Sequence, residues 1–280
     1  MAISVRPLSN AVGAEALDID LSDTLEADDF DKVYEAFLEF GLLAFRRQHI
    51  TPDEQIKFSS RFGAISVHPM QEARHPDHPE LIVIQNKTYR YDEDPETDSE
   101  DKEGDKVGVI PWHSDLTYTT KPSVAAVLYA IAVPPEGGET GFIDIARVYD
   151  ALPTRVQHQI EDLEAVHWLG TDAGPADARF DKVVHPLVLI HPESRRKGLN
   201  VSPFFIREIV GMDKKEGRQL LDWLIDFTLQ PEFIYYHTWE VGDAVIWDNR
   251  RTMHHATGWD HRHRRILHRT TIGGVYDFAS

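Results

Sequence analysis

The chain has 280 residues, 41% of them hydrophobic, which is enough for a large core at a length where β-sandwiches and barrels stay undivided, so we expect a single domain over residues 1–280. The 47 acidic residues outnumber the 29 Lys and Arg, and a net charge of −18 argues against nucleic acid or an anionic membrane as a partner, because both need a basic surface. The absence of cysteine excludes disulfides, thiolate nucleophiles, zinc–thiolate sites and iron–sulfur clusters.

The start of the chain, MAISVRPLSN, has no apolar run of signal-peptide length. A transmembrane helix needs about 18 apolar residues in a row, and the sequence contains no such run. We therefore expect a cytoplasmic protein that does not span a membrane.

The first predicted elements are two helices and a strand. Residues 30–38 place apolar side chains at helical spacing, and Gly41 ends the run. Residues 42–45 are all apolar, which predicts a short buried strand. The sequence Thr51-Pro52-Asp53-Glu54 is a capping box with proline at the first helical position, and it predicts a helix that runs to about Phe62.

A strongly acidic segment follows the next predicted strand, residues 81–85. Residues 92–106 contain nine acidic residues and two lysines, so they cannot bury apolar surface. We expect a solvated, mobile loop over residues 86–110. Its role is either that of a solubilising insertion or that of a lid beside a neighbouring site.

The second half of the chain is dominated by short β-like runs separated by turn signals. Asp213 is the expected N-cap of one strong helix, from about Lys214 to Leu229. This pattern predicts a mainly β protein with flanking helices (α+β), in a closed or double-sheet architecture. The expected strands are 124–133, 185–190, 233–237, 244–247 and 265–271.

Three side chains form a candidate metal site. His113 and Asp115 are two residues apart, and on a strand such residues project to the same face. His254 or His255 can supply a third ligand, because a barrel brings distant strands together. Two histidines and one carboxylate leave coordination positions open, which suits non-haem Fe(II) oxygen chemistry. A His-x-Asp pair alone is common on protein surfaces, so the pair by itself is weak evidence.

Two arginines near the C-terminus form a candidate anion site. In the predicted strand 265–271, Arg265 and Arg269 share one face. If that face is buried, the two guanidinium groups need anionic partners. The planar guanidinium binds a carboxylate through two parallel hydrogen bonds.

Four motifs occur in one order, and together they are far more specific than any one of them. They are Trp112-His113-Ser114-Asp115, Gly137-Gly138-Glu139-Thr140, Trp247-Asp248-Asn249-Arg250 ending at His254, and Arg265 eleven residues later. With them, the chain from about Val5 to Gly274 resembles the taurine / 2,4-dichlorophenoxyacetate dioxygenase family (TauD/TfdA-like). Members of this family are Fe(II)- and 2-oxoglutarate-dependent oxygenases.

The resemblance implies a fold and a set of site residues. The implied core is a double-stranded β-helix, a jelly roll of the cupin type. Fe(II) is held by His113, Asp115 and His254, while His255 points the other way. Thr140 and Arg265 hold the distal carboxylate of 2-oxoglutarate. Arg269 lies near both this co-substrate and the anionic group of the primary substrate.

The resemblance also bears on the primary substrate. His68 matches a histidine that touches the acid group of the substrate in the taurine enzyme. Val109 and Gln71 stand where the taurine enzyme has asparagine and tyrosine, which favours a substrate bulkier or less polar than taurine. We expect a small carboxylate, sulfonate, sulfate ester or phosphonate. Because relatives are often dimers or tetramers, we also expect a homo-oligomer.

The implied reaction is hydroxylation of a C–H bond, in which 2-oxoglutarate and O2 yield succinate and CO2. It needs no catalytic side chain beyond the metal centre. The residues themselves also allow a non-oxidative, metal-dependent β-barrel hydrolase or isomerase, in which Arg265 and Thr140 contact the acid group of the substrate. A binding protein without activity predicts no metal, and substrate-coupled succinate release separates the two kinds of enzyme.

Overall fold

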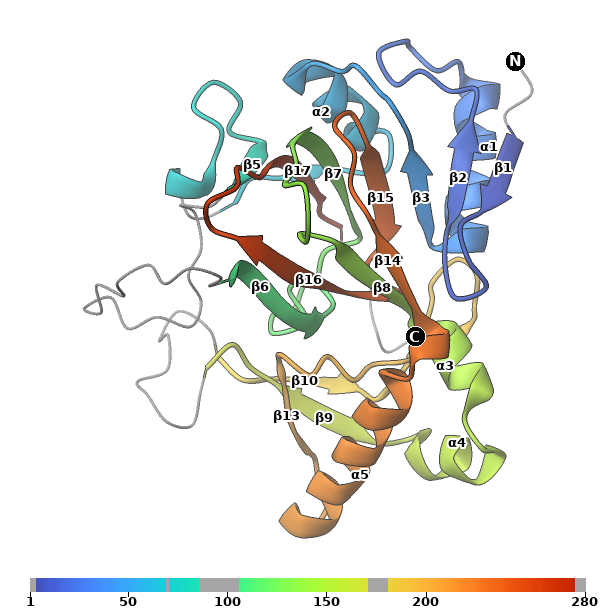
Figure 1. The fold of residues 1–280 in the computed structure, drawn as a ribbon. Helices are drawn as coiled ribbons and strands as arrows, with labels where there is room; N and C mark the ends of the chain where they lie inside the picture. The colour runs from blue at the N-terminus through green and yellow to red at the C-terminus, as the bar shows by residue number, and fades with distance from the viewer. Residues whose placement is uncertain (1–3, 69–70, 86–105, 171–180, 275–280) are drawn as a thin grey trace.

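The computed structural model describes residues 4–68, 71–85, 106–170 and 181–274 (Figure 1). The helices are α1 (Ala27–Phe40), α2 (Pro52–Ser60), α3 (Ile145–Ala151), α4 (Thr154–Ile160) and α5 (Lys214–Thr228), with 3-10 turns η1 (Gln71–Ala73) and η2 (Pro231–Phe233). The strands are β1 (Ser4–Pro7), β2 (Ala14–Leu17), β3 (Leu42–Phe45), β4 (Ile65–Ser66), β5 (Leu81–Gln85), β6 (Lys106–His113), β7 (Ala125–Ala132), β8 (Thr140–Asp144), β9 (Glu164–His167), β10 (Val183–Pro186), β11 (Val188–Ile190), β12 (Lys197–Leu199), β13 (Ile206–Ile209), β14 (Ile234–His237), β15 (Ala244–Asp248), β16 (Thr252–Asp260) and β17 (Ile266–Ile272).

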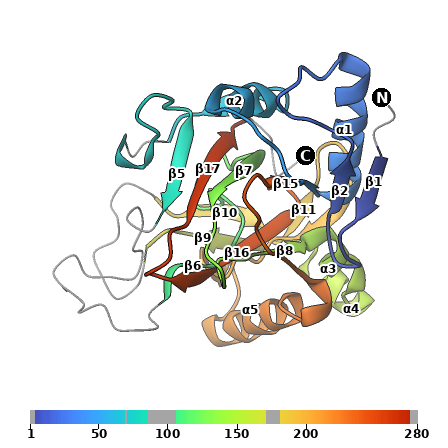
Figure 2. The same cartoon turned by 45° about the horizontal axis from the view of Figure 1, so that its top comes forward.

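Two sheets form the core of the fold. The larger has the order β1-β2-β3-β15-β7-β17-β4, with β5 also paired to β17, and the smaller has the order β14-β8-β16-β6. Figure 2 shows α1 and α2 on one side of this pair of sheets and α3, α4 and α5 on the other. The predicted mainly β architecture with flanking helices is confirmed.

The strand β3 shows why a continuous apolar run forms a strand here. Leu42 and Ala44 face the smaller sheet and pack in the same cluster as Phe142. Leu43 and Phe45 face the opposite way and pack with residues of α1 and α2. Both faces of the strand are buried, so every position is apolar and no alternation appears in the sequence.

The helix α2 begins as its capping box predicts. The side chain of Thr51 accepts a hydrogen bond from Glu54 N, and Glu54 accepts one from Thr51 N at 2.7 Å. The helix ends at Ser60 rather than at the predicted Phe62. Phe62 instead packs edge-on against Phe30 of α1, with 5.1 Å between ring centroids.

A third layer covers the outer face of the smaller sheet. It contains β9, β10 and β13, the pair β11–β12, and α3 to α5. The prediction of one strand over 185–190 is wrong: β10 ends at Pro186 and pairs with β9, while β11 pairs with β12. Proline has no N–H to continue a ladder, so the chain changes partners there. The predicted cap of α5 is confirmed, because Asp213 accepts from Lys215 N and Glu216 N.

The predicted loop over 86–110 needs a correction at its end. Residues 106–110 belong to β6, whose Lys106 and Ile110 pair with Asp260 and Ala256 of β16. Residues 86–105, with nearly all of the acidic run, lie outside the described residues. Among the helices of the described residues, none combines the length and the apolar character that a bilayer span requires.

Candidate metal centre

The three side chains predicted as metal ligands converge at one place between the two sheets. His113 ends β6 and lies directly opposite His254 of β16, so sheet register brings the two imidazoles together, with 4.2 Å between ring centroids. Asp115 follows two residues after His113. One ligand atom from each of the three residues lies within 4.8 Å of the others, and all three residues are buried.

The geometry of this His113–Asp115–His254 cluster fits one divalent cation. Oδ1 of Asp115 lies 3.7 Å from Nε2 of His113 and 3.8 Å from Nε2 of His254. When a metal forms bonds of about 2.1 Å, adjacent ligand atoms lie about 3 Å apart. Each of the three side chains would therefore need to move by less than about 1 Å to bind one cation. Two neutral imidazoles and one carboxylate on one side of the ion are the facial triad of non-haem Fe(II) sites.

The charge state of the cluster suits metal binding. Burial alone would raise the pKa of Asp115, but the Arg269 guanidinium, together with His254 and His113, holds it well below its usual range. Burial and the neighbouring His113 hold the pKa of His254 well below its usual value. Asp115 is therefore an anion and His254 a neutral imidazole near pH 7, which are the forms that bind a metal.

Neighbouring groups fix the orientation of His113 and its strand end. The Nδ1–H of His113 donates to the carbonyl oxygen of Pro111 at 2.7 Å, which leaves Nε2 free to accept a metal. Ser114 is held on both sides: its N–H donates to Ser202 Oγ and its hydroxyl to the carbonyl of Thr252. These two serines could not be predicted from the sequence, because nothing in the local pattern marks a serine as a support for a ligand.

His255, the alternative third ligand, lies away from the cluster. Its ring stacks on Trp112, with 5.1 Å between centroids, and its Nδ1–H donates to the carbonyl of Ile110 at 2.8 Å. Adjacent residues of β16 point to opposite faces, so only one of the two histidines can face the space between the sheets. Trp247 is fully buried, and its ring centroid is 4.8 Å from that of His254.

The candidate anion site lies at the start of β17. Arg265 is 3% exposed, its guanidinium lies 4.8 Å from the centre of the Trp259 ring, and its Nη2–H donates to the carbonyl of Gly138 at 3.1 Å. Burial lowers the pKa of Arg265 to about 10, so it stays cationic near pH 7. Thr140, two residues after Gly138, is buried at the start of β8 and accepts a hydrogen bond from Trp239 Nε1 at 3.0 Å.

Comparison with known proteins assigns the family. A profile described as "Taurine catabolism dioxygenase TauD, TfdA family" matches residues 4–271. The chain belongs to this family. An (S)-phenoxypropionate/alpha-ketoglutarate-dioxygenase of Sphingobium herbicidovorans is 35% identical over 98% of this chain and 96% of its own length. An alpha-ketoglutarate-dependent 2,4-dichlorophenoxyacetate dioxygenase of Cupriavidus pinatubonensis is 33% identical over 97% of this chain and 98% of its own length.

Solved structures of TauD-type enzymes share the fold. A taurine dioxygenase from Burkholderia xenovorans superposes with a TM-score of 0.82 at 29% identity, covering 98% of this chain and 92% of that one. AAD-2, solved with Mn(II) and N-oxalylglycine, superposes with a TM-score of 0.80 at 30% identity and covers both chains completely. The expected jelly-roll core is confirmed. This TauD/TfdA-family protein is a 2-oxoglutarate-dependent dioxygenase, an oxidoreductase with an iron centre that uses O2.

Three further residues singled out from the sequence lie on the periphery of the TauD/TfdA fold. His68 follows β4, and its carbonyl accepts a hydrogen bond from Arg74 Nε at 2.6 Å. Gln71 begins η1 and is exposed. Val109 is 41% exposed on β6, opposite Thr257 of β16. None of the three belongs to the His113–Asp115–His254 cluster.

An aromatic wall, formed by Tyr118, Phe204 and Phe205, stands beside His113. The ring centroids of Phe204 and Phe205 lie 6.0 and 5.7 Å from that of His113, and Tyr118 packs on Phe205 at 4.7 Å. This wall could not be predicted from the sequence, because the two phenylalanines lie in a segment between strands where no periodicity marks an inward face. It places apolar surface next to the metal centre.

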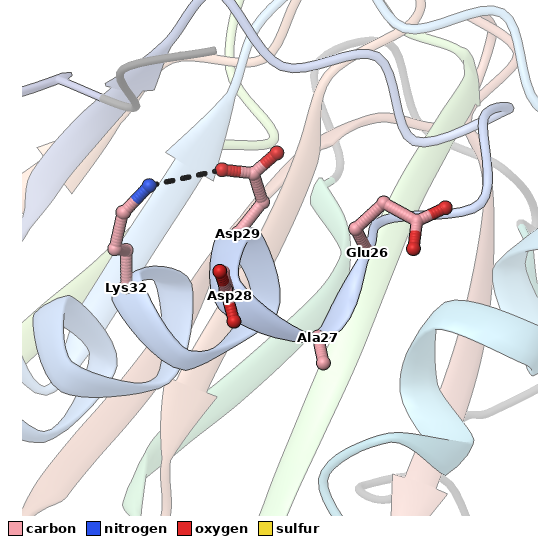
Figure 3. Close-up of a pocket in the computed structure, with 5 residues that line it drawn as sticks. All are labelled: Glu26, Ala27, Asp28, Asp29 and Lys32. Atoms are coloured by element: carbon pink, nitrogen blue, oxygen red, sulfur yellow. Dashed lines mark hydrogen bonds and ion pairs between the residues drawn. The ribbon is translucent and has the colours of Figure 1, made fainter.

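A cavity elsewhere on the molecule is unrelated to this centre. It measures about 520 Å³ and lies at the start of α1 (Figure 3). Its lining residues are Glu26, Ala27, Asp28, Asp29 and Lys32, and none of them belongs to the cluster. Three carboxylates and one lysine, itself paired to Asp29 at 3.0 Å, disfavour an anionic ligand there.

Proposed function

We propose that this dioxygenase binds Fe(II) through His113, Asp115 and His254 and hydroxylates a C–H bond of a small organic acid. The observation that carries the proposal is the convergence of two imidazole nitrogens and one carboxylate oxygen within 4.8 Å, with the second oxygen of the carboxylate occupied by Arg269. When bound, Fe(II) with 2-oxoglutarate supplies the O2-activating chemistry that oxidises the C–H bond and releases succinate and CO2.

The residues of the chain bind and orient in this proposal. Arg265 and Thr140 hold the distal carboxylate of 2-oxoglutarate, and the burial and positive charge of the Arg265 guanidinium support this role, because a charge-assisted hydrogen bond is stronger where water is excluded. Its planar fork can bind a carboxylate through two hydrogen bonds. We assign Arg269, which lies on β17 and pairs with Asp115, to the inner end of the co-substrate or to the acid group of the substrate.

We propose that the primary substrate carries an apolar body as well as its acid group. The aromatic wall beside His113 supports this, because aromatic side chains bury apolar ligand surface and stack on rings. His68, Gln71 and Val109 are the proposed contacts on the substrate side. The relatives named above act on a phenoxypropionate and on 2,4-dichlorophenoxyacetate, and others are named for alkyl sulfates and sulfate esters. An aryloxyalkanoate is the first substrate to test, before sulfate esters, sulfonates and phosphonates.

The test is a substrate screen on the full chain reconstituted with Fe(II), ascorbate, 2-oxoglutarate and O2. Succinate and the oxidised product are both quantified for 2-phenoxypropionate (each enantiomer), 2,4-dichlorophenoxyacetate, an alkyl sulfate, taurine and an alkylphosphonate. We expect succinate release coupled to product for an aryloxyalkanoate and the least for taurine. Conversion of an acid without succinate contradicts the oxidative reaction and supports the hydrolase or isomerase.

A variant of the aromatic wall tests the substrate class separately. Phe204→Ala removes one half-buried ring beside His113. We expect KM for an aryloxy acid to rise about tenfold, as for a lost aromatic contact of 1–1.5 kcal/mol, with half-saturation by 2-oxoglutarate unchanged. The control is Phe227→Ala on α5, where Phe227 stacks on Trp223. Equal KM values for Phe204→Ala and the wild type contradict the aromatic assignment.

We further propose that the enzyme acts in the cytoplasm as a homodimer or homotetramer, without nucleic acid or a membrane as partner. The net charge of −18 supports the last point, because phosphate groups repel such a surface. The fold contains no cysteine and so needs no oxidising compartment. Light scattering on the purified chain measures its molar mass in solution. The mass of a monomer contradicts the proposed homo-oligomer.

A further inference from the structure

We propose that Asn249 is a positioning residue for the metal centre: its side chain fixes the main chain of Asp115 and thereby the direction of the carboxylate. The inference rests on the proposed role of Asp115 as a metal ligand. Neither the metal motif nor the family resemblance gives Asn249 this task.

The carboxamide of Asn249 forms hydrogen bonds to the main chain of Asp115 through both its oxygen and its nitrogen. Its Oδ1 accepts from Asp115 N at 2.7 Å, and its Nδ2 donates to the carbonyl of Asp115 at 2.9 Å. A second hydrogen bond from Nδ2, also of 2.9 Å, reaches the carbonyl of Ser123. All three bonds are buried, and 134 residues separate Asn249 from Asp115 along the chain. A carboxamide carries its acceptor oxygen and its donor nitrogen on two separate atoms, which this double contact to one residue requires.

The segment that Asn249 holds needs such support. Asp115 lies just beyond the end of β6, outside the sheet ladder, so its buried N–H and C=O require partners from elsewhere. The next residue, Leu116, has a φ of 58°, a left-handed conformation that a leucine rarely adopts. Such a conformation persists only where the surrounding structure holds it.

Asn249 is itself held firmly. Its N–H donates to the carbonyl of Val124 at 2.9 Å. The preceding residue, Asp248, is fully buried and accepts from His191 Nε2 at 2.9 Å and from Arg250 Nε and Nη2 at 2.8 and 2.7 Å. These contacts anchor the turn between β15 and β16 against the rest of the core.

The same turn leads into the strand that carries His254. One anchored turn therefore sets the position of two of the three proposed ligands: His254 through the chain of β16 and Asp115 through the carboxamide of Asn249. Partners outside the ligand set orient ligands in this way, and their loss typically lowers metal affinity 10- to 100-fold. The geometry assigns Asn249 to that role.

The experiment compares Asn249→Ala and Asn249→Ser with the same changes at Asn200. Asn200 is a matched control, because both asparagines are 2% exposed and the Nδ2 of Asn200 donates to Pro186 O at 3.1 Å. Neither that bond nor its backbone bond to Leu187 involves a proposed ligand. Asn249→Ser keeps a hydroxyl that can accept from Asp115 N, so it provides a milder variant if Asn249→Ala does not fold.

Two measurements on the metal-free full chain separate positioning from general support. Mn²⁺ affinity is measured by the loss of the free-ion electron paramagnetic resonance signal, and coordination geometry by the absorption bands of bound Co²⁺. Thermal unfolding without metal reports on folding alone. We expect Mn²⁺ affinity to fall about 10- to 100-fold in Asn249→Ala and less in Asn249→Ser, with altered Co²⁺ bands. Both Asn200 variants should keep affinity within about twofold at a similar loss of thermal stability.

The results can contradict the positioning role of Asn249 and the proposed metal site separately. Asn249 variants that unfold at lower temperature but bind Mn²⁺ as the Asn200 variants do, with wild-type Co²⁺ bands, overturn the positioning role alone. Wild-type protein that binds no divalent metal, or Asp115→Ala that binds it as tightly as wild type, overturns the metal site and this inference with it.

Discussion

Nη2 of Arg269 lies 2.6 Å from Oδ2 of Asp115 and joins the larger sheet to the end of β6. The other oxygen of this carboxylate, Oδ1, lies 3.7 and 3.8 Å from the Nε2 atoms of His113 and His254. The two oxygens of Asp115 therefore have separate partners. In the proposed metal centre, Oδ1 would bind the cation, while the Arg269 guanidinium neutralises Oδ2.

Arg269→Leu tests this division. Breaking a buried ion pair leaves an uncompensated charge and costs about 3–5 kcal/mol, so the metal-free protein should lose about that much free energy of unfolding. Saturating Mn²⁺ should recover part of the loss, because the cation takes over the neutralisation of Asp115. Urea unfolding with and without Mn²⁺ measures both. The control Arg218→Leu breaks an exposed pair with Asp222 and should change stability by less than about 1 kcal/mol. If Arg269→Leu loses the same free energy of unfolding with and without Mn²⁺, the proposed division of the two Asp115 oxygens between metal and Arg269 is contradicted.

Asp115→Ala removes the single anionic ligand of the proposed centre. Loss of a partner outside the ligand set lowers metal affinity about 10- to 100-fold, and loss of a ligand itself should exceed that. Succinate release should drop to background. The control is Asp150→Ala, which removes an exposed carboxylate paired with Arg196 and should leave affinity unchanged. Retained turnover in Asp115→Ala excludes the triad.

Arg265→Ala tests the proposed binding of 2-oxoglutarate. Removing one partner of a buried, charge-assisted contact costs about 2–5 kcal/mol, which corresponds to roughly a 30-fold or greater rise in the half-saturating 2-oxoglutarate concentration. The neighbouring Arg264 is exposed, so Arg264→Ala is the matched control and should behave as wild type. Succinate release against 2-oxoglutarate concentration gives both values. A half-saturation within threefold of wild type in Arg265→Ala removes it from this role.

His167 should make the protein less stable in mild acid. It is fully buried, neither ring nitrogen has a hydrogen-bond partner in the described structure, and burial, with His185 and Arg207 nearby, lowers its pKa to about 3. Below the unfolded pKa of about 6.5, only the unfolded chain takes up this proton, so stability falls as pH decreases until about pH 3.

Between pH 7 and pH 5, the loss of free energy of unfolding that His167 causes amounts to about 2 kcal/mol. Urea unfolding of metal-free His167→Leu should therefore show about 2 kcal/mol less loss over that interval than the wild type. His158→Leu, which changes an exposed histidine of α4, should keep the wild-type pH dependence. The same pH dependence in His167→Leu and the wild type contradicts the prediction.

Elements with a strong local signal were predicted best. The bounds of β3 and β5 match the prediction at both ends, and α5 ends one residue earlier than predicted. The strands β8, β9 and β13 and the seven-residue helices α3 and α4 were not predicted. Segments of four to seven residues are too short to show a period, and their conformation is set by the sheet or core against which they pack.

The sequence by itself determined the types and spacing of the chemistry-bearing residues: the His-x-Asp pair, the two later histidines, and the arginines at positions 265 and 269. These follow from local pattern, since spacing along a strand determines which side chains share a face. Only the tertiary structure decided that Arg269 pairs with Asp115, that Asn249 holds the main chain of Asp115, and that an aromatic wall stands beside His113. Those contacts join segments far apart in the chain, and they form only when the sheets close over a shared core and buried polar groups must find partners.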